Sequence, residues 1–110
     1  LSTTIALKIN FIGEITGHSY IKMTLESAKD TNPEDSVTPL KGSYYEAVSD
    51  NTFKIMGRYD SNSHLWKLDC FDSRNRHTST FLGKETEEGS ITGTWSTKET
   101  TRKFYLKQDD

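Results

Sequence analysis

The sequence has a single cysteine, Cys70, and only two prolines among its 110 residues. One cysteine excludes a disulfide within the chain, so the cysteine content selects no redox compartment. Long hydrophobic runs are also lacking, because no apolar stretch approaches the roughly eighteen residues that a membrane-spanning helix needs. We therefore expect a soluble chain without a transmembrane segment.

Charge of one sign does not dominate the chain. Fourteen Lys and Arg residues stand against sixteen Asp and Glu residues, which gives a formal net charge of −2, and both signs are spread along the sequence. Such a chain generates no field of one sign that would attract a phosphate backbone. A nucleic-acid partner is therefore not expected.

The sequence also lacks the short motifs that bind metals and cofactors. His18, His64 and His77 lie in different segments, and none has a second ligand at the spacing of HExxH or CxxC. There is no nucleophile elbow, no phosphate-binding glycine loop and no dinucleotide fingerprint. We expect a protein without a metal or cofactor, and not an enzyme.

The remaining reactive side chains have structural explanations. Cys70 alternates with Trp66 and Leu68, which is typical of a small buried hydrophobic residue in a strand and not of a catalytic thiol. Charges on a solvated sheet face explain the carboxylates that could otherwise pair for acid–base chemistry. These carboxylates are Glu46, Asp60, Asp69 and Asp72.

Helical periodicity is absent, and alternation of apolar and polar residues takes its place. Ile21, Met23 and Leu25, for example, fall on one face of a strand. The expected strands cover residues 4–15, 18–27, 40–48, 52–60, 64–72, the segment around 77–83, 91–96 and 101–107. Short polar turns favour pairing between neighbours, and closure hides the two edges. We predict one all-β domain over residues 1–110, an eight-stranded antiparallel up-and-down meander closed into a small barrel.

Three strands share a frame with an aliphatic residue, a glycine and an aromatic residue at alternate positions. The frame reads LKGSY at 40–44, IMGRY at 55–59 and ITGTW at 91–95. Residues two apart share a face, so each glycine is expected to point inward, where it lets the strand coil and leaves room for a neighbouring ring. The frame predicts sites of curvature in a small barrel.

The aromatic residues of these strands allow two interpretations. A barrel of eight strands has space either for its own side chains or for one small ligand. We favour a filled interior. If the barrel is hollow, the residues expected to line a ligand cavity are Tyr44, Tyr59, Trp66 and Trp95.

One segment, AKDTNPEDSVTP at 28–39, is longer than a tight turn and holds both prolines. Long loops on a rigid sheet often carry function. Its polar residues also have the spacing that begins a calcium loop, but the glycine and the distal glutamate of such a loop are missing. We expect a loop that binds a partner through Asp30, Asn32, Glu34 and Asp35.

The succession of glycine and aromatic strands resembles the small secreted or periplasmic β-barrel modules of bacteria. GRYDS at 57–61 and ITGTWS at 91–96 are also similar to strands of the avidin family, whose eight-stranded barrel, like that of lipocalins, binds a small ligand. An avidin begins with its GTW strand, whereas this chain reaches it second from last, so no biotin-contacting residue is carried over. Periplasmic lysozyme inhibitors share the barrel architecture alone, which is an analogy of folds.

Together these patterns favour a non-enzymatic binding protein of the bacterial envelope or secreted fraction, with its signal peptide removed. We expect it to bind another protein through loops or a sheet face, as an inhibitor or an immunity-type partner. The alternative is a carrier of a small apolar ligand in the barrel interior.

Overall fold

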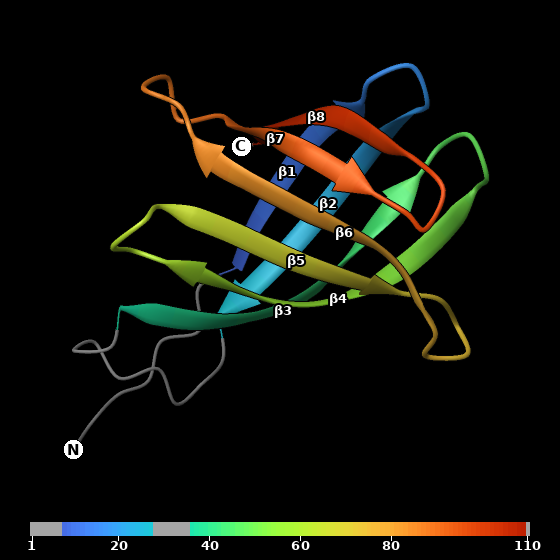
Figure 1. Ribbon diagram of the computed structural model, residues 1–110, viewed down its shortest axis with the longest axis horizontal. Coiled ribbons are helices and arrows are strands. Elements are labelled where there is room, and N and C mark those ends of the chain that lie inside the picture. Colours follow the sequence, from blue (N-terminus) through green and yellow to red (C-terminus); the bar gives the residue numbers. More distant parts are fainter. Residues whose placement is uncertain (1–7, 28–35, 110) are drawn as a thin grey trace.

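The computed structural model describes residues 8–27 and 36–109 of the chain, and these residues form a closed β-barrel (Figure 1). Each strand pairs antiparallel with the next, and the last pairs with the first. The predicted all-β fold, an eight-stranded antiparallel meander closed into a barrel, is confirmed. The strands are β1 (Lys8–Ile15), β2 (Ser19–Ser27), β3 (Val37–Glu46), β4 (Asn51–Asp60), β5 (Leu65–Phe71), β6 (His77–Glu85), β7 (Ile91–Ser96) and β8 (Thr101–Gln108).

The predicted start of the third strand is wrong. β3 begins at Val37 and not at residue 40, so the loop predicted for 28–39 is shorter and Pro39 lies inside a strand. Proline has no N–H to donate and is confined to strand ends and edges. In the described pairs Pro39 faces only Arg58 of β4, because β2 joins the ladder at Leu40. Proline is therefore tolerated at this position.

The barrel interior is occupied by apolar side chains from every strand. Alternate residues point inward because successive side chains of a strand lie on opposite faces. Part of this packing is aromatic: the ring of Phe81 meets the rings of Tyr44 and Phe104 edge to face, at centroid distances of 5.1 and 4.9 Å. The buried cluster comprises Phe11, Ile15, Ile21, Met23, Leu25, Leu40, Tyr44, Ile55, Trp66, Leu68, Cys70, Phe81, Ile91, Trp95, Phe104 and Leu106.

The inward glycines let neighbouring backbones approach closely. Gly93 lies between buried Ile91 and Trp95, as the repeated frame predicts. A Cβ at Gly93 would overlap the carbonyl oxygen of Leu82 and lie 2.6 Å from the Cα of Gly83. The ring expected over a glycine is found at Gly83, where Phe104 Cζ lies 2.9 Å from the position of a Cβ. The close approach of the paired strands β6 and β7 thus depends on glycine at positions 83 and 93, where no side chain separates the two backbones.

Four turns gather at one end of the barrel, on the right in Figure 1. They connect β1 to β2, β3 to β4, β5 to β6 and β7 to β8, and this end is called the four-turn end below. Asp50 and Asn75 adopt left-handed φ angles of 55° and 60° in two of these turns, a conformation that Asn and Asp tolerate. The turns at 61–64 and 86–90 lie at the opposite end.

Candidate functional site

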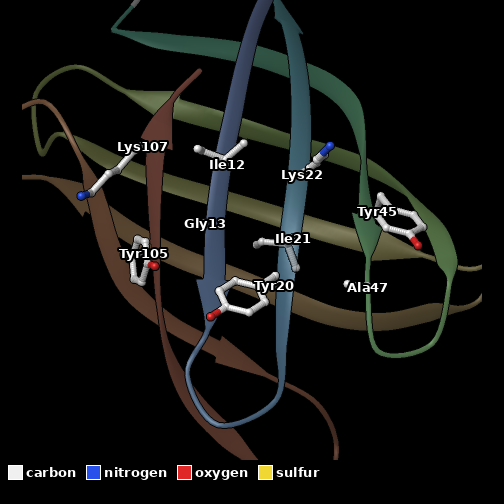
Figure 2. A pocket seen from close by; sticks show the side chains of 9 residues that line it. All are labelled: Ile12, Gly13, Tyr20, Ile21, Lys22, Tyr45, Ala47, Tyr105 and Lys107. Atoms are coloured by element: carbon white, nitrogen blue, oxygen red, sulfur yellow. The ribbon is translucent and has the colours of Figure 1, made fainter. Parts of the chain in front are cut away.

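A hollow of about 380 Å³ lies on the outside of the barrel, over β8, β1, β2 and β3. Figure 2 shows Tyr105 and Tyr45 on its two sides, with Ile12 and Tyr20 between them. Ala47, which carries only a methyl group, leaves space among the larger residues. The lining residues are Ile12, Gly13, Tyr20, Ile21, Lys22, Tyr45, Ala47, Tyr105 and Lys107.

Strand register places the outward side chains of this face in rows. Ile12 is paired with Lys22 on one side and Lys107 on the other, and Lys22 is paired with Tyr45. This row crosses four strands and spans about 14 Å, given strands roughly 4.8 Å apart. An apolar side chain therefore stands between two cations on a rigid sheet.

A second row runs beside the first. Glu14 is paired with both Tyr20 and Tyr105, so a half-buried carboxylate lies between two tyrosines. Tyr20 is 69% exposed, so most of its large phenol ring faces solvent. A second hollow continues from Tyr20 to Val48, which is 64% exposed in the turn after β3. The apolar surface thus extends from the middle of β1 to the four-turn end.

Local contacts orient two of the tyrosines. The hydroxyl of Tyr45 donates a hydrogen bond of 2.6 Å to Asp50 Oδ1, and this bond raises the pKa of the Tyr45 phenol. Lys107 Nζ lies 6.0 Å from the ring centroid of Tyr105, within cation–π range. Both rings line the hollow, so these contacts help to orient its sides.

Sequence reasoning missed this outer face, although the sequence contains a sign of it. Strict alternation predicts polar residues on the outside, but every strand except β7 carries adjacent apolar or aromatic residues, including the four strands of this face. On this face the doublets are Phe11–Ile12, Tyr20–Ile21, Tyr44–Tyr45 and Phe104–Tyr105, and in each of them one member points inward and the other outward. The doublets lie on four strands that the closed barrel makes adjacent.

The predicted ligand residues Tyr44, Tyr59, Trp66 and Trp95 lie in two groups. Tyr59 and Trp66 are directly paired, with ring centroids 4.6 Å apart, and Trp66 Nε1 donates a hydrogen bond of 3.2 Å to Glu85. Along β4, Tyr59 is about 20 Å from the level of Tyr44, given roughly 3.3 Å per residue. Tyr59 and Trp66 therefore lie far from the other two residues, Tyr44 and Trp95.

Tyr44 and Trp95 lie toward the four-turn end. The ring of Tyr44 stacks on Phe53 at 5.1 Å, and the indole of Trp95 stacks on the imidazole of His18 at 4.9 Å. A role of the four residues in ligand binding stays a prediction. The residues predicted for the partner-binding loop, Asp30, Asn32, Glu34 and Asp35, lie outside the described residues.

One carboxylate departs from its expected place on a solvated face. Glu46 is 6% exposed and points inward, in phase with Tyr44 two residues earlier. Its carboxylate accepts a hydrogen bond of 2.7 Å from Ser49 and lies 3.2 Å from His18 Nε2. The alternation that places Tyr44 inward also places Glu46 inward, so it could have indicated this burial. A buried charge is tolerated only when it is paired, and here Ser49 and His18 are its partners.

Cys70 and His64 show no nucleophilic arrangement. Cys70 is fully buried, as predicted, and burial raises the pKa of its thiol to about 12. A thiol with this pKa is protonated at neutral pH and is a poor nucleophile. His64 Nδ1 lies 3.3 Å from the hydroxyl of Tyr59, on the outside of the turn after β4.

Within residues 8–27 and 36–109, no three His, Cys, Asp or Glu side chains lie close enough together to hold a metal ion. The same part of the chain contains no helix that is long and apolar enough to cross a membrane. No protein-family model, curated protein or solved structure matches this chain.

Proposed function

We propose that the protein is a non-catalytic binding protein that holds another protein against the outer face of β8, β1, β2 and β3. The observation that supports this proposal is the exposed row of Lys107, Ile12 and Lys22, with Tyr20 beside it. Exposed apolar surface rimmed by polar residues marks interaction sites in soluble proteins. The four strands form a rigid surface, so little conformational entropy is lost on binding.

The shape of the face favours a protein side chain as the bound group. The hollow lies on the outside of the sheet and is partly open to solvent, whereas pockets for small molecules enclose most of the ligand. Tyrosine is enriched at the energetic centres of protein interfaces, because its ring buries a large area and its hydroxyl still reaches a hydrogen-bond partner. Tyr20, Tyr45 and Tyr105 supply three such rings.

The charges define the chemistry of the partner. Lys22 and Lys107 stand on both sides of Ile12, and the half-buried Glu14 offsets only part of their charge. A complementary partner presents an apolar side chain with carboxylates on either side of it. A second copy of this chain would bring lysines close to lysines, so it is disfavoured as the occupant.

We base the proposed type of partner on the sequence. An inhibitor or an immunity-type protein needs a stable surface and no catalytic group, and the barrel is compatible with both requirements. The proposed location in the bacterial periplasm or the secreted fraction stays a prediction. Because side chains from every strand pack the interior, this function is favoured over the alternative, a carrier of a small apolar ligand.

Site-specific photo-crosslinking tests the proposed face. A photoreactive amino acid is placed at position 20, or at position 82 as a control, because Leu82 is an exposed residue on β6. Both proteins are exposed to envelope extract and to purified lysozymes, and excess unlabelled protein competes for specific adducts. We expect a competed adduct only from position 20.

The partner identified in this way is then titrated with purified variants. We expect Tyr20→Ala to weaken binding at least tenfold, equivalent to about 1.4 kcal/mol, as residues at interface centres do. Lys22→Glu should weaken it further at low salt, and Leu82→Ala should bind like the parent. Equal losses from Tyr20→Ala and Leu82→Ala, or adducts formed only with a second copy of the chain, would overturn the proposal.

A further inference from the structure

A hollow of about 440 Å³ lies on the outer surface of β1, β2, β3 and β4, beside the proposed partner face. It is called the cationic hollow below, because three lysines line it, one from each of β1, β3 and β4. Met56, which is 52% exposed, supplies an apolar wall. The charged residues of this hollow are Lys8, Glu26, Lys41 and Lys54.

Strand pairing gathers these charges, although they are far apart in the sequence. Glu26 is paired with Lys8 of β1 on one side and with Lys41 of β3 on the other. On β4, Lys54 lies two residues from Met56, which is the direct partner of Lys41. One carboxylate therefore stands among three cations.

The lysines of the cationic hollow are not neutralised by carboxylates. Among residues 8–27 and 36–109, no ion pair joins Lys8, Lys41 or Lys54 to an acidic side chain. Lys54 Nζ instead donates a hydrogen bond of 2.6 Å to Oδ1 of the neutral Asn75. The whole chain has a formal net charge of −2, so the charge of this hollow is opposite to that of the chain. A local excess of positive charge attracts anionic groups.

The proposed partner face is small for a protein interface. Its row from Lys107 to Tyr45 spans about 14 Å across four strands. A standard interface covers roughly 800 Å² on each partner, which is the area of a square with sides of about 28 Å. Contacts with the partner are therefore expected to continue beyond this row.

Charge decides in which direction the contacts continue. One neighbouring hollow, beyond Tyr105, is lined by Glu87 and Glu88, which would repel a partner that carries carboxylates. The cationic hollow would attract the same partner, and it shares β1, β2 and β3 with the partner face. Lys22 and Glu26 mark the two surfaces on β2 and are about 13 Å apart, given roughly 3.3 Å per residue. One protein segment can span this distance.

We propose that an acidic segment of the protein partner binds in the cationic hollow, with its carboxylates near Lys41 and Lys54 and the aliphatic parts of its side chains against Met56. This inference rests on the proposed function, because it identifies a second contact region for the same partner. Exposed ion pairs add little affinity, whereas complementary charge speeds association strongly. The lysines therefore act chiefly on the rate at which the partner binds.

A titration with hexaglutamate tests the cationic hollow without the partner. Backbone amide shifts of the ¹⁵N-labelled protein are recorded at low salt, and we expect saturable changes centred on residues 41–43 and 54–56 that disappear at high salt. Lys41→Gln combined with Lys54→Gln should weaken binding at least threefold. Lys67→Gln combined with Lys84→Gln makes the same change in net charge on the outer faces of β5 and β6, and it should leave binding unchanged.

Three results of this titration overturn the proposal. They are shifts that are absent or spread evenly over the barrel, equal weakening by the two pairs of variants, and tighter binding of an oligothymidylate of equal charge. The last result would assign the hollow to nucleic acid and not to a protein.

Photo-crosslinking from position 56 tests the partner itself. We expect the protein captured from position 20 to be captured here too, through a peptide with more Asp and Glu than Lys and Arg. Lys41→Gln combined with Lys54→Gln should slow its association at least threefold at low salt and change its dissociation less than twofold. Capture from position 20 but not from position 56 would overturn the cationic hollow and leave the proposed function standing. Capture from neither position would overturn the proposed function, and this inference with it.

Discussion

Substitution of Gly93 by alanine tests the packing on which the barrel depends. The added Cβ would overlap the carbonyl oxygen of Leu82 and lie 2.6 Å from the Cα of Gly83. Both obstacles are backbone atoms of a paired strand, so they can move only if the ladder between β6 and β7 opens or shifts. The strain therefore cannot be relieved by a change of side-chain rotamer.

The expected loss of stability is large for a chain of this size. Overpacking of a core usually costs about 1–3 kcal/mol, and a clash against backbone places Gly93→Ala at or above the upper end of that range. A domain of this size has roughly 5–15 kcal/mol of stability in total. A loss of about 3 kcal/mol should lower the thermal midpoint by roughly 10 °C or more.

Chemical and thermal denaturation of purified variants measures this loss against two controls. Thr94→Val keeps a β-branched side chain one position away on the exposed face and only exchanges a hydroxyl for a methyl group, so it should change stability by less than about 0.5 kcal/mol. Gly89→Ala has open space around its Cβ but a φ of +82°, so backbone strain alone should cost about 1–2 kcal/mol. If Gly93→Ala unfolds at the parental midpoint, the close approach of β6 and β7 at this glycine is refuted.

Three further predictions concern polar groups. Cys70, with a thiol pKa of about 12, should react with a thiol reagent only when the protein unfolds, and rapid labelling of the folded protein at pH 8 would contradict its burial. Backbone N–H groups of Arg76 and Arg74 lower the pKa of Asp72, so this carboxylate stabilises the fold above its ordinary pKa and loses that effect as the pH falls through the folded-state value. Denaturation across pH should therefore show Asp72→Asn less stable than the parent at pH 7 and level with it in acid, and a gap independent of pH would contradict the role of charge. His18→Ala leaves Glu46 without one partner and should cost about 1–3 kcal/mol in the same assay, with a change in indole fluorescence; a silent substitution would show that the stacked ring is not held in place.

The alternation of residues was sufficient to predict the strands and their closure. Ile21, Met23 and Leu25 could pack only if one face of their strand met a core, and short turns left neighbour pairing as the simplest arrangement. The position of Gly93 followed from the same period of two. These features are local, so one strand at a time was enough to predict them.

The outer face and the buried carboxylate could not be predicted in the same way, because they depend on which strands become neighbours. Ile12 becomes part of a continuous row of outward side chains only when closure of the barrel places Lys107 on one side and Lys22 on the other. Glu46 was assigned to solvent by its charge, although its phase with Tyr44 placed it inside. Its burial requires His18, which lies 28 residues away in sequence.

The most direct measurement is a backbone amide and methyl chemical-shift map of the labelled protein, recorded with and without the partner captured at position 20. We expect the largest changes on β8, β1, β2 and β3, centred on Ile12 and Tyr20, and almost none on β5 and β6. A map centred on the four-turn end, or on β5 and β6, would contradict the assignment of the outer face as the binding surface.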